Sequence, residues 1–185
     1  IGGFLMERFT YISLLICASA FPLFRSFETK IKFYKSWKYL FPAIILVAIP
    51  FIIWDVWFTS IGVWSFNEKY VLGVYLWRLP IEEWMFFFVI PYCCVFIYEC
   101  VNHFGVKNYL ENRARKITLL FILIIVILLS LNLKHLYTLL TSTLLTCLLI
   151  FLFLFESKAR LGKYILSWLF CIIPFLIVNG ILTYL

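Results

Sequence analysis

Two long apolar stretches decide the fold of this chain: Ile117–Leu133, ITLLFILIIVILLSLNL, and Leu136–Phe155, LYTLLTSTLLTCLLIFLFLF. Neither stretch contains a charged residue, and neither alternates between apolar and polar positions. A helix of about 20 apolar residues spans the hydrocarbon core of a bilayer, whereas a membrane strand alternates with a period of two. The two stretches therefore predict neighbouring transmembrane helices and argue against a β-barrel.

The rest of the chain has the same character. Of its 185 residues, 65% are hydrophobic and 14% are charged, well below the roughly 25% charged residues of a soluble domain. Four further apolar segments are Phe9–Phe24, Tyr39–Phe58, Leu79–Val101 and Tyr164–Leu185. Because lipid offers no hydrogen bonds to the backbone, we predict an all-α fold. The protein is expected to be a polytopic, multi-pass bundle of about six transmembrane helices in a lipid bilayer.

The basic residues indicate the orientation of this bundle. The net charge is +7, but most lysines and arginines lie in three loops between apolar segments, which argues against nucleic acid as a partner. These loops carry Arg25, Lys30, Lys32, Lys35 and Lys38; Lys107, Arg113, Arg115 and Lys116; and Lys158, Arg160 and Lys163. In a six-span protein all three loops lie on one side, which the positive-inside rule assigns to the cytoplasm. Both termini are then expected outside.

A weak internal repeat divides the chain. Phe27–Lys30 (FETK) is followed by basic residues and later by Ile49–Asp55, and Phe155–Lys158 (FESK) is followed in the same way by Ile173–Asn179. We therefore expect a first repeat in residues 1–105, and a linking helix with an incomplete second repeat in residues 106–185. Repeated helical units in membrane proteins often place the working site at their interface. Because the second copy stops early and the chain starts at Ile1, we expect both ends to be clipped.

Three carboxyl groups are candidates for chemistry: Asp55 near the outer end of the second segment, and Glu82 and Glu83 at the outer start of the third. One interpretation is local, because proline favours the first helical position and carboxylates favour the positive end of the helix dipole. The other is functional, because ionisable groups among Trp84 and three phenylalanines are costly in a membrane. An apolar site can keep one carboxyl protonated, ready to act as a Brønsted acid.

Aromatic residues surround these carboxyls in the sequence. Tryptophans commonly form belts at membrane interfaces, but aromatic faces also stabilise cations. Under the second interpretation, the candidates for lining a carbocation are Trp54, Trp64, Trp84 and Phe87. The cysteines and histidines show no zinc spacing, so we predict no metal site.

The segment from residue 49 to 88 resembles the small membrane-integral lycopene cyclases. The resemblance rests on Ile49-Pro50-Phe51 with Trp54-Asp55, on Gly62-Val63-Trp64-Ser65-Phe66, and on Leu79-Pro80-Ile81-Glu82-Glu83 before Phe86-Phe87-Phe88. This family occurs as heterodimers in some bacteria and as fused domains in archaea and fungi, and it is built from two copies of a short helical domain. The resemblance implies a carotenoid-pathway enzyme in the bacterial inner membrane.

The implied activity is a redox-neutral, isomerase-type (intramolecular lyase) ring closure. An acid protonates the terminal double bond of the linear carotenoid lycopene, the next double bond attacks the cation, and loss of a ring proton leaves a β-ionone ring, as in β-carotene. No cofactor is expected. The resemblance implies Glu82 or Glu83 as the acid, with Asp55 as its partner. Asn179 replaces the second Asp of the repeat, so a second cyclase subunit or a homo-oligomer is expected to complete the site.

Two other functions compete with this one. The first is a different carotenoid- or prenyl-modifying membrane enzyme on the same scaffold. The second is a proton-coupled transporter or scaffold in which Asp55 and Glu82 carry ions or contact a partner. The carboxyls cluster at one membrane end and no predicted helix has a charge at its midpoint, which argues against a transporter.

Overall fold

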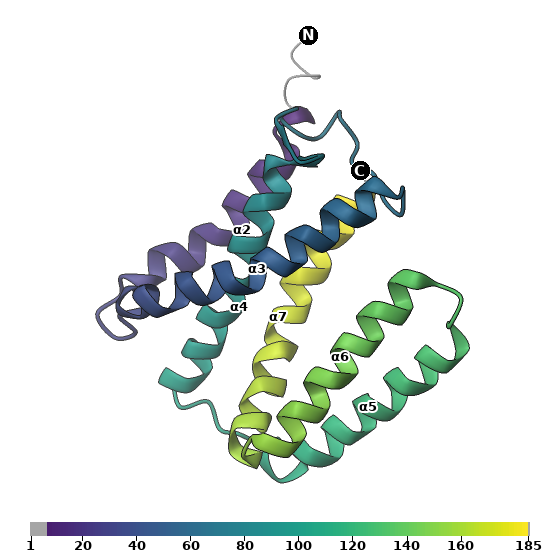
Figure 1. Ribbon diagram of the computed structural model, residues 1–185. Helices are drawn as coiled ribbons and strands as arrows, with labels where there is room; N and C mark the ends of the chain where they lie inside the picture. The colour runs from purple at the N-terminus through teal and green to yellow at the C-terminus, as the bar shows by residue number, and fades with distance from the viewer. Residues whose placement is uncertain (1–6, 185) are drawn as a thin grey trace. The chain divides into compact units, whose positions relative to one another are not determined.

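The computed structural model describes residues 7–184 and is almost entirely helical (Figure 1). Its described α-helices are α2 (Thr10–Ser26), α3 (Trp37–Ser60), α4 (Ile81–His103), α5 (Ala114–Leu131), α6 (Leu136–Phe155) and α7 (Lys158–Tyr184). The predicted all-α bundle of about six helices is confirmed, and each apolar segment corresponds to one helix. The largest difference is in α7, which begins at Lys158 instead of Tyr164, because the basic stretch before the apolar run is helical as well.

Five of these helices are long and apolar enough to cross a membrane, and α2 is a shorter apolar helix of 17 residues. The protein is therefore a multi-pass membrane protein. Helix α6 shows why the protein needs lipid around it. None of its residues is buried within the chain, and most of its exposed large side chains are leucine, phenylalanine and isoleucine. Such a surface suits lipid and would be very costly in water.

The described residues divide into two compact units, one formed by Phe104–Leu169 and the other by the remainder. In the first of these, α5 and α6 pack side by side as an antiparallel pair (Figure 1). In the other unit, α4 packs against both α2 and α3. This second unit contains all of the carboxyl and aromatic residues singled out above.

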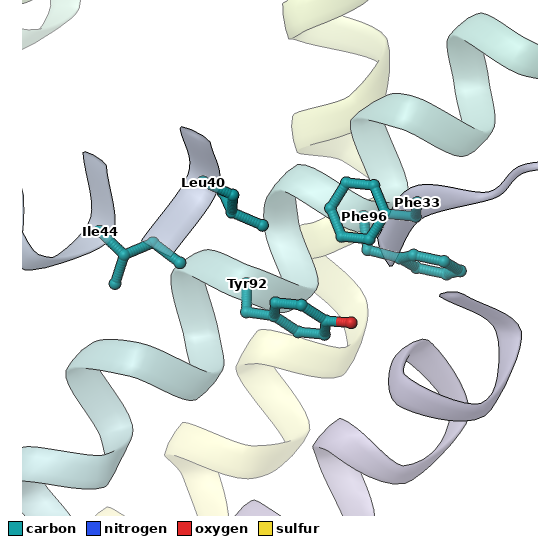
Figure 2. Packing of buried hydrophobic residues seen from close by; sticks show 5 residues of the cluster. All are labelled: Phe33, Leu40, Ile44, Tyr92 and Phe96. Atoms are coloured by element: carbon teal, nitrogen blue, oxygen red, sulfur yellow. The ribbon is translucent and has the colours of Figure 1, made fainter. Parts of the chain in front are cut away.

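A buried cluster of Phe33, Leu40, Ile44, Tyr92 and Phe96 ties the start of α3 to the middle of α4 (Figure 2). Phe33 comes from a short 3-10 helix, Phe33–Ser36, in the basic loop before α3. Its ring centroid lies 5.6 Å from that of Tyr92 and 5.5 Å from that of Phe96. In the sequence the basic residues of this loop indicate the membrane orientation, but the side chain of Phe33 in the same loop is part of the core.

The connection between α3 and α4 folds back over the other end of this unit. Its two short strands, β1 (Tyr75–Leu76) and β2 (Leu79–Pro80), pair antiparallel. The two turn residues, Trp77 and Arg78, have φ angles of 50° and 69°, as a type I′ turn requires. Pro80 is therefore a strand residue, and helix α4 begins one residue later, which corrects the expected role of Pro80 as the first helical residue.

Candidate active site

Three helix ends bring Asp55, Glu83 and a tyrosine together. The chain reverses direction twice between α2 and α4, so the start of α2, the end of α3 and the start of α4 lie at one end of the unit. The phenol of Tyr11, in the first turn of α2, donates a hydrogen bond of 2.6 Å to Oε2 of Glu83. The carboxyl groups of Asp55 and Glu83 are hydrogen-bonded to each other.

A hydrogen bond between two carboxyl groups has a chemical consequence. An ionised carboxylate has only acceptor oxygens, so two of them cannot form a hydrogen bond. Asp55 and Glu83 can therefore share a hydrogen bond only when one of them is protonated. Two like charges close together in apolar surroundings repel strongly, which favours such a singly protonated state. This is the arrangement that a Brønsted acid needs.

Glu82 points elsewhere and has a different environment. Its side chain is 0% exposed, and Oε1 accepts a hydrogen bond of 2.6 Å from the backbone N–H of Leu72. In the described part of the chain its Oε2 is buried and has no hydrogen-bond partner. Adjacent residues of an α-helix lie about 100° apart around the axis, so Glu82 faces the connection between α3 and α4 while Glu83 faces α2 and α3.

That connection covers the carboxyl groups. Val71 is buried against Tyr11 and Leu15 of α2, and Met85 and Phe86 of α4 pack against the same cluster. Backbone hydrogen bonds join the N–H of Tyr11 to the carbonyl of Tyr70, at 3.3 Å, and the N–H of Ile81 to the carbonyl of Val74, at 2.9 Å. The covering segment thereby keeps water from the carboxyl groups on this side, which strengthens every electrostatic interaction among them.

Helix α4 also carries a shallow apolar groove, on the face turned away from Glu83, because successive helix residues lie about 100° apart. It has a volume of about 230 Å³ and is lined by Trp84, Met85, Phe88 and Val89, all on α4. The indole N–H of Trp84 donates to the carbonyl of Leu76, at 3.3 Å, which fixes the ring at the start of the groove. Because these four side chains are apolar, the groove suits a hydrocarbon better than a polar ligand.

The four aromatic residues predicted to line a cation lie in two places. Trp84 and Phe87 both pack against the buried cluster of Ala48, Ile52 and Leu79, and Trp84 also lines the groove. Trp54 and Trp64 both stack on the ring of Phe58, with centroid distances of 5.2 and 5.0 Å and interplanar angles of 18°. Trp54 nevertheless directly precedes Asp55 in α3. Contact of these residues with a cation stays a prediction.

Two hydrogen-bond donors to the carboxyl groups were not predicted from the sequence: the phenol of Tyr11 and the backbone N–H of Leu72. A signal for Tyr11 was present, because the predicted topology puts the start of the first segment at the same membrane end as Asp55 and Glu82. A tyrosine in that turn is polar and within reach of that end. No sequence signal marks the N–H of Leu72, because every residue except proline carries one.

Comparison with protein-family models gives one match, to the family described as lycopene cyclase, over residues 8–101 and 134–185. Comparisons with curated proteins and with solved structures found no match. The matched ranges contain Tyr11 and all three carboxyl residues, as well as the groove on α4. Since the match extends over well more than half of the chain, this membrane protein belongs to the lycopene cyclase family.

Proposed function

We propose that this chain closes the end groups of lycopene into β-ionone rings, with Glu83 as the acid and Asp55 as its partner. Membership of the family supports a carotenoid cyclase in general. The observation that carries the finer assignment is the contact of the Glu83 carboxyl with Asp55 and Tyr11 among apolar side chains. A carboxyl kept protonated in apolar surroundings can give its proton to an alkene, which is a poor base.

The proposed steps balance in atoms and electrons. Glu83 gives its proton to the terminal double bond of lycopene, which leaves a tertiary cation. The electron pair of the next double bond forms the new carbon–carbon bond of a six-membered ring and moves the cation into that ring. The carboxylate pair then removes a ring proton, and the ring double bond forms. The product is an isomer of the substrate, so no electron acceptor or donor is consumed.

Glu83 is a better candidate for the acid than Glu82. Glu83 has a second carboxyl, Asp55, as its neighbour, and the two can share one proton. Glu82 instead accepts from the backbone N–H of Leu72, in the connection between α3 and α4. Glu82 is also completely buried. We assign it to holding the covering segment in place.

The aromatic residues would act on the cation after protonation. Trp84 follows Glu83 in α4 and lines the groove, so its indole face is one candidate π-surface for the new cation. Cations are attracted to such faces within about 6 Å of the ring centroid. Trp54, Trp64 and Phe87 remain further candidates, with Trp54 nearest in sequence to Asp55.

The test is expression of the full chain in a bacterial host that accumulates lycopene, with separation of the pigments by chromatography. The wild-type chain should form β-carotene, Glu83→Gln should abolish it, and Asp55→Asn should lower it severely. Glu99→Gln is the matched control, because Glu99 lies on the same helix about 24 Å further along. The membrane content of each variant is measured by immunoblot.

Two outcomes would contradict the proposal. If the wild-type chain is present in the membrane and lycopene remains linear, the proposed activity is wrong for this chain acting alone. If Glu83→Gln forms β-carotene at the wild-type rate, the acid has been misassigned. An ε-ring product would retain the cyclisation but refute the assignment of the final proton loss.

We also propose that a second cyclase subunit or a second copy of this chain contributes to the enzyme in a bacterial inner membrane. This rests on the internal repeat, in which Ile173–Asn179 corresponds to Ile49–Asp55. Asn179, in α7, stands where the repeat would place a second Asp. Co-purification of two differently tagged copies from membranes tests self-association, and its absence would leave only a different subunit as the partner.

A further inference from the structure

Tyr11 is held rigidly at the carboxyl pair. Its side chain is 6% exposed and packs against Leu15 and Val71. Its backbone N–H is bonded to the carbonyl of Tyr70, which ties the first turn of α2 to the covering segment. A phenol with so little freedom loses little further entropy when it makes a hydrogen bond.

The phenol contacts one specific oxygen of Glu83. Its O–H donates to Oε2, at 2.6 Å. In a protonated carboxyl group, one oxygen carries the hydrogen and the other is the carbonyl acceptor. An oxygen that already accepts a short hydrogen bond from a phenol is stabilised as the carbonyl oxygen. When Glu83 is protonated, this contact therefore favours the hydrogen on Oε1.

We propose that Tyr11 is a positioning residue that keeps the proton of Glu83 on Oε1, the oxygen that delivers it. The inference deepens the proposed function and rests on Glu83 being the acid. Without the phenol, the hydrogen can occupy either oxygen, and the carboxyl can rotate away from a productive direction. Tyr11 need not touch the substrate, because it acts entirely through Glu83.

An infrared measurement tests this placement without any carotenoid. The C=O stretching band of a protonated carboxyl moves to higher wavenumber when its carbonyl oxygen loses a hydrogen bond. In the purified full-length chain, the band of Glu83 is identified by its disappearance in Glu83→Gln. Tyr11→Phe should move this band to higher wavenumber. Tyr39→Phe should leave it in place, because Tyr39 is exposed and lies about 24 Å along α3 from Asp55.

A second substitution keeps the test decisive if Tyr11→Phe does not fold. Incorporation of 3-fluorotyrosine at position 11 retains the shape of the ring and makes the phenol a stronger donor. The band should then move to lower wavenumber. A band that does not move in either variant, or that moves in the opposite direction because Oε2 carries the hydrogen, would overturn the inference.

Turnover separates this inference from the proposed function. Loss of one hydrogen bond to a reacting carboxyl corresponds to about a 10-fold to 100-fold decrease in kcat, and KM should change much less, because the phenol is not among the groove-lining groups. If the band shifts as expected but the wild-type chain does not cyclise lycopene, the placement of the proton stands and the proposed function fails. If the chain cyclises lycopene and the band does not shift, only the role of Tyr11 fails.

Discussion

Substitution of Glu82 separates the roles of the two adjacent glutamates. Glu82 accepts the N–H of Leu72 from inside the core, whereas Glu83 meets Asp55 and Tyr11. Glu82→Gln keeps an oxygen acceptor of the same size at this place. Glu82→Leu keeps the approximate volume and removes the acceptor, so that the N–H of Leu72 is left without its partner.

The size of each effect follows from this one contact. A hydrogen bond of this kind contributes about 1 kcal/mol. Because Glu82→Gln keeps an oxygen acceptor, it should lower the free energy of local opening by at most about 1 kcal/mol, which is at most about a 5-fold increase in the open population. In Glu82→Leu the unpartnered donor adds its desolvation cost, for a total of about 2–3 kcal/mol and an increase of about 30-fold to 150-fold.

Amide hydrogen exchange of the full-length chain in lipid nanodiscs measures this opening. Exchange in peptides covering residues 70–76 should accelerate in the order wild type, Glu82→Gln, Glu82→Leu, because exchange of a protected amide reports the free energy of opening. Peptides from α6, in the other unit, are the internal control and should not change. Equal exchange at residues 70–76 in all three proteins would refute the anchoring role of Glu82.

The same variants report on the chemistry. Glu82→Gln should retain measurable formation of β-carotene, because the carboxyl pair of Glu83 and Asp55 is intact. If Glu82→Gln abolishes ring closure while exchange at residues 70–76 is unchanged, the roles are reversed and Glu82 is the acid.

Three further predictions test the chemistry and the packing. In deuterated water each ring formed should gain one deuterium, because the proton comes from an exchangeable carboxyl; mass spectrometry of the product checks this, and an unlabelled ring would contradict protonation by a solvent-exchanged acid. Gly162→Ala should lower the free energy of unfolding by about 1–3 kcal/mol, because the new Cβ would clash with the side chain of Asn108. The Asn108 side chain donates a hydrogen bond to the Ala159 carbonyl of α7. Thermal unfolding in detergent should show a much smaller loss when Gly162→Ala is made in an Asn108→Ala background. Arg78→Gly should raise the midpoint of the same unfolding transition by relieving a φ of 69°, a strain of about 1–2 kcal/mol, and a lower midpoint would mean that the arginine side chain makes a compensating contact.

The sequence predicts the helices because their cause is local. A run such as Ile117–Leu133 needs no partner to be recognised as a transmembrane helix, since the bilayer is its solvent. Pro80 and the two glutamates after it mark the start of α4 to within one residue. The division into two repeats depends on a weak similarity between distant segments, and it stays a prediction.

That Asp55 and Glu83 lie at the same end of their helices could also be predicted, because successive membrane helices run in opposite directions. Their direct contact could not. Glu82 and Glu83 are neighbours in the sequence with equal chemistry, and only the rotation of α4 about its axis directs one to a backbone N–H and the other to a carboxyl.

The amino-acid sequence alone determined that this protein spans a membrane, where its apolar helices lie, and that Asp55 and Glu83 come at neighbouring helix ends. Hydrophobicity and charge are properties of each residue and its near neighbours, so they can be read along the chain. The tertiary structure alone decided that Tyr11 binds Glu83, that Leu72 binds Glu82, and that Trp54 and Trp64 stack on Phe58. These contacts depend on how helices pack and rotate against one another, and side chains far apart in the sequence set that packing jointly.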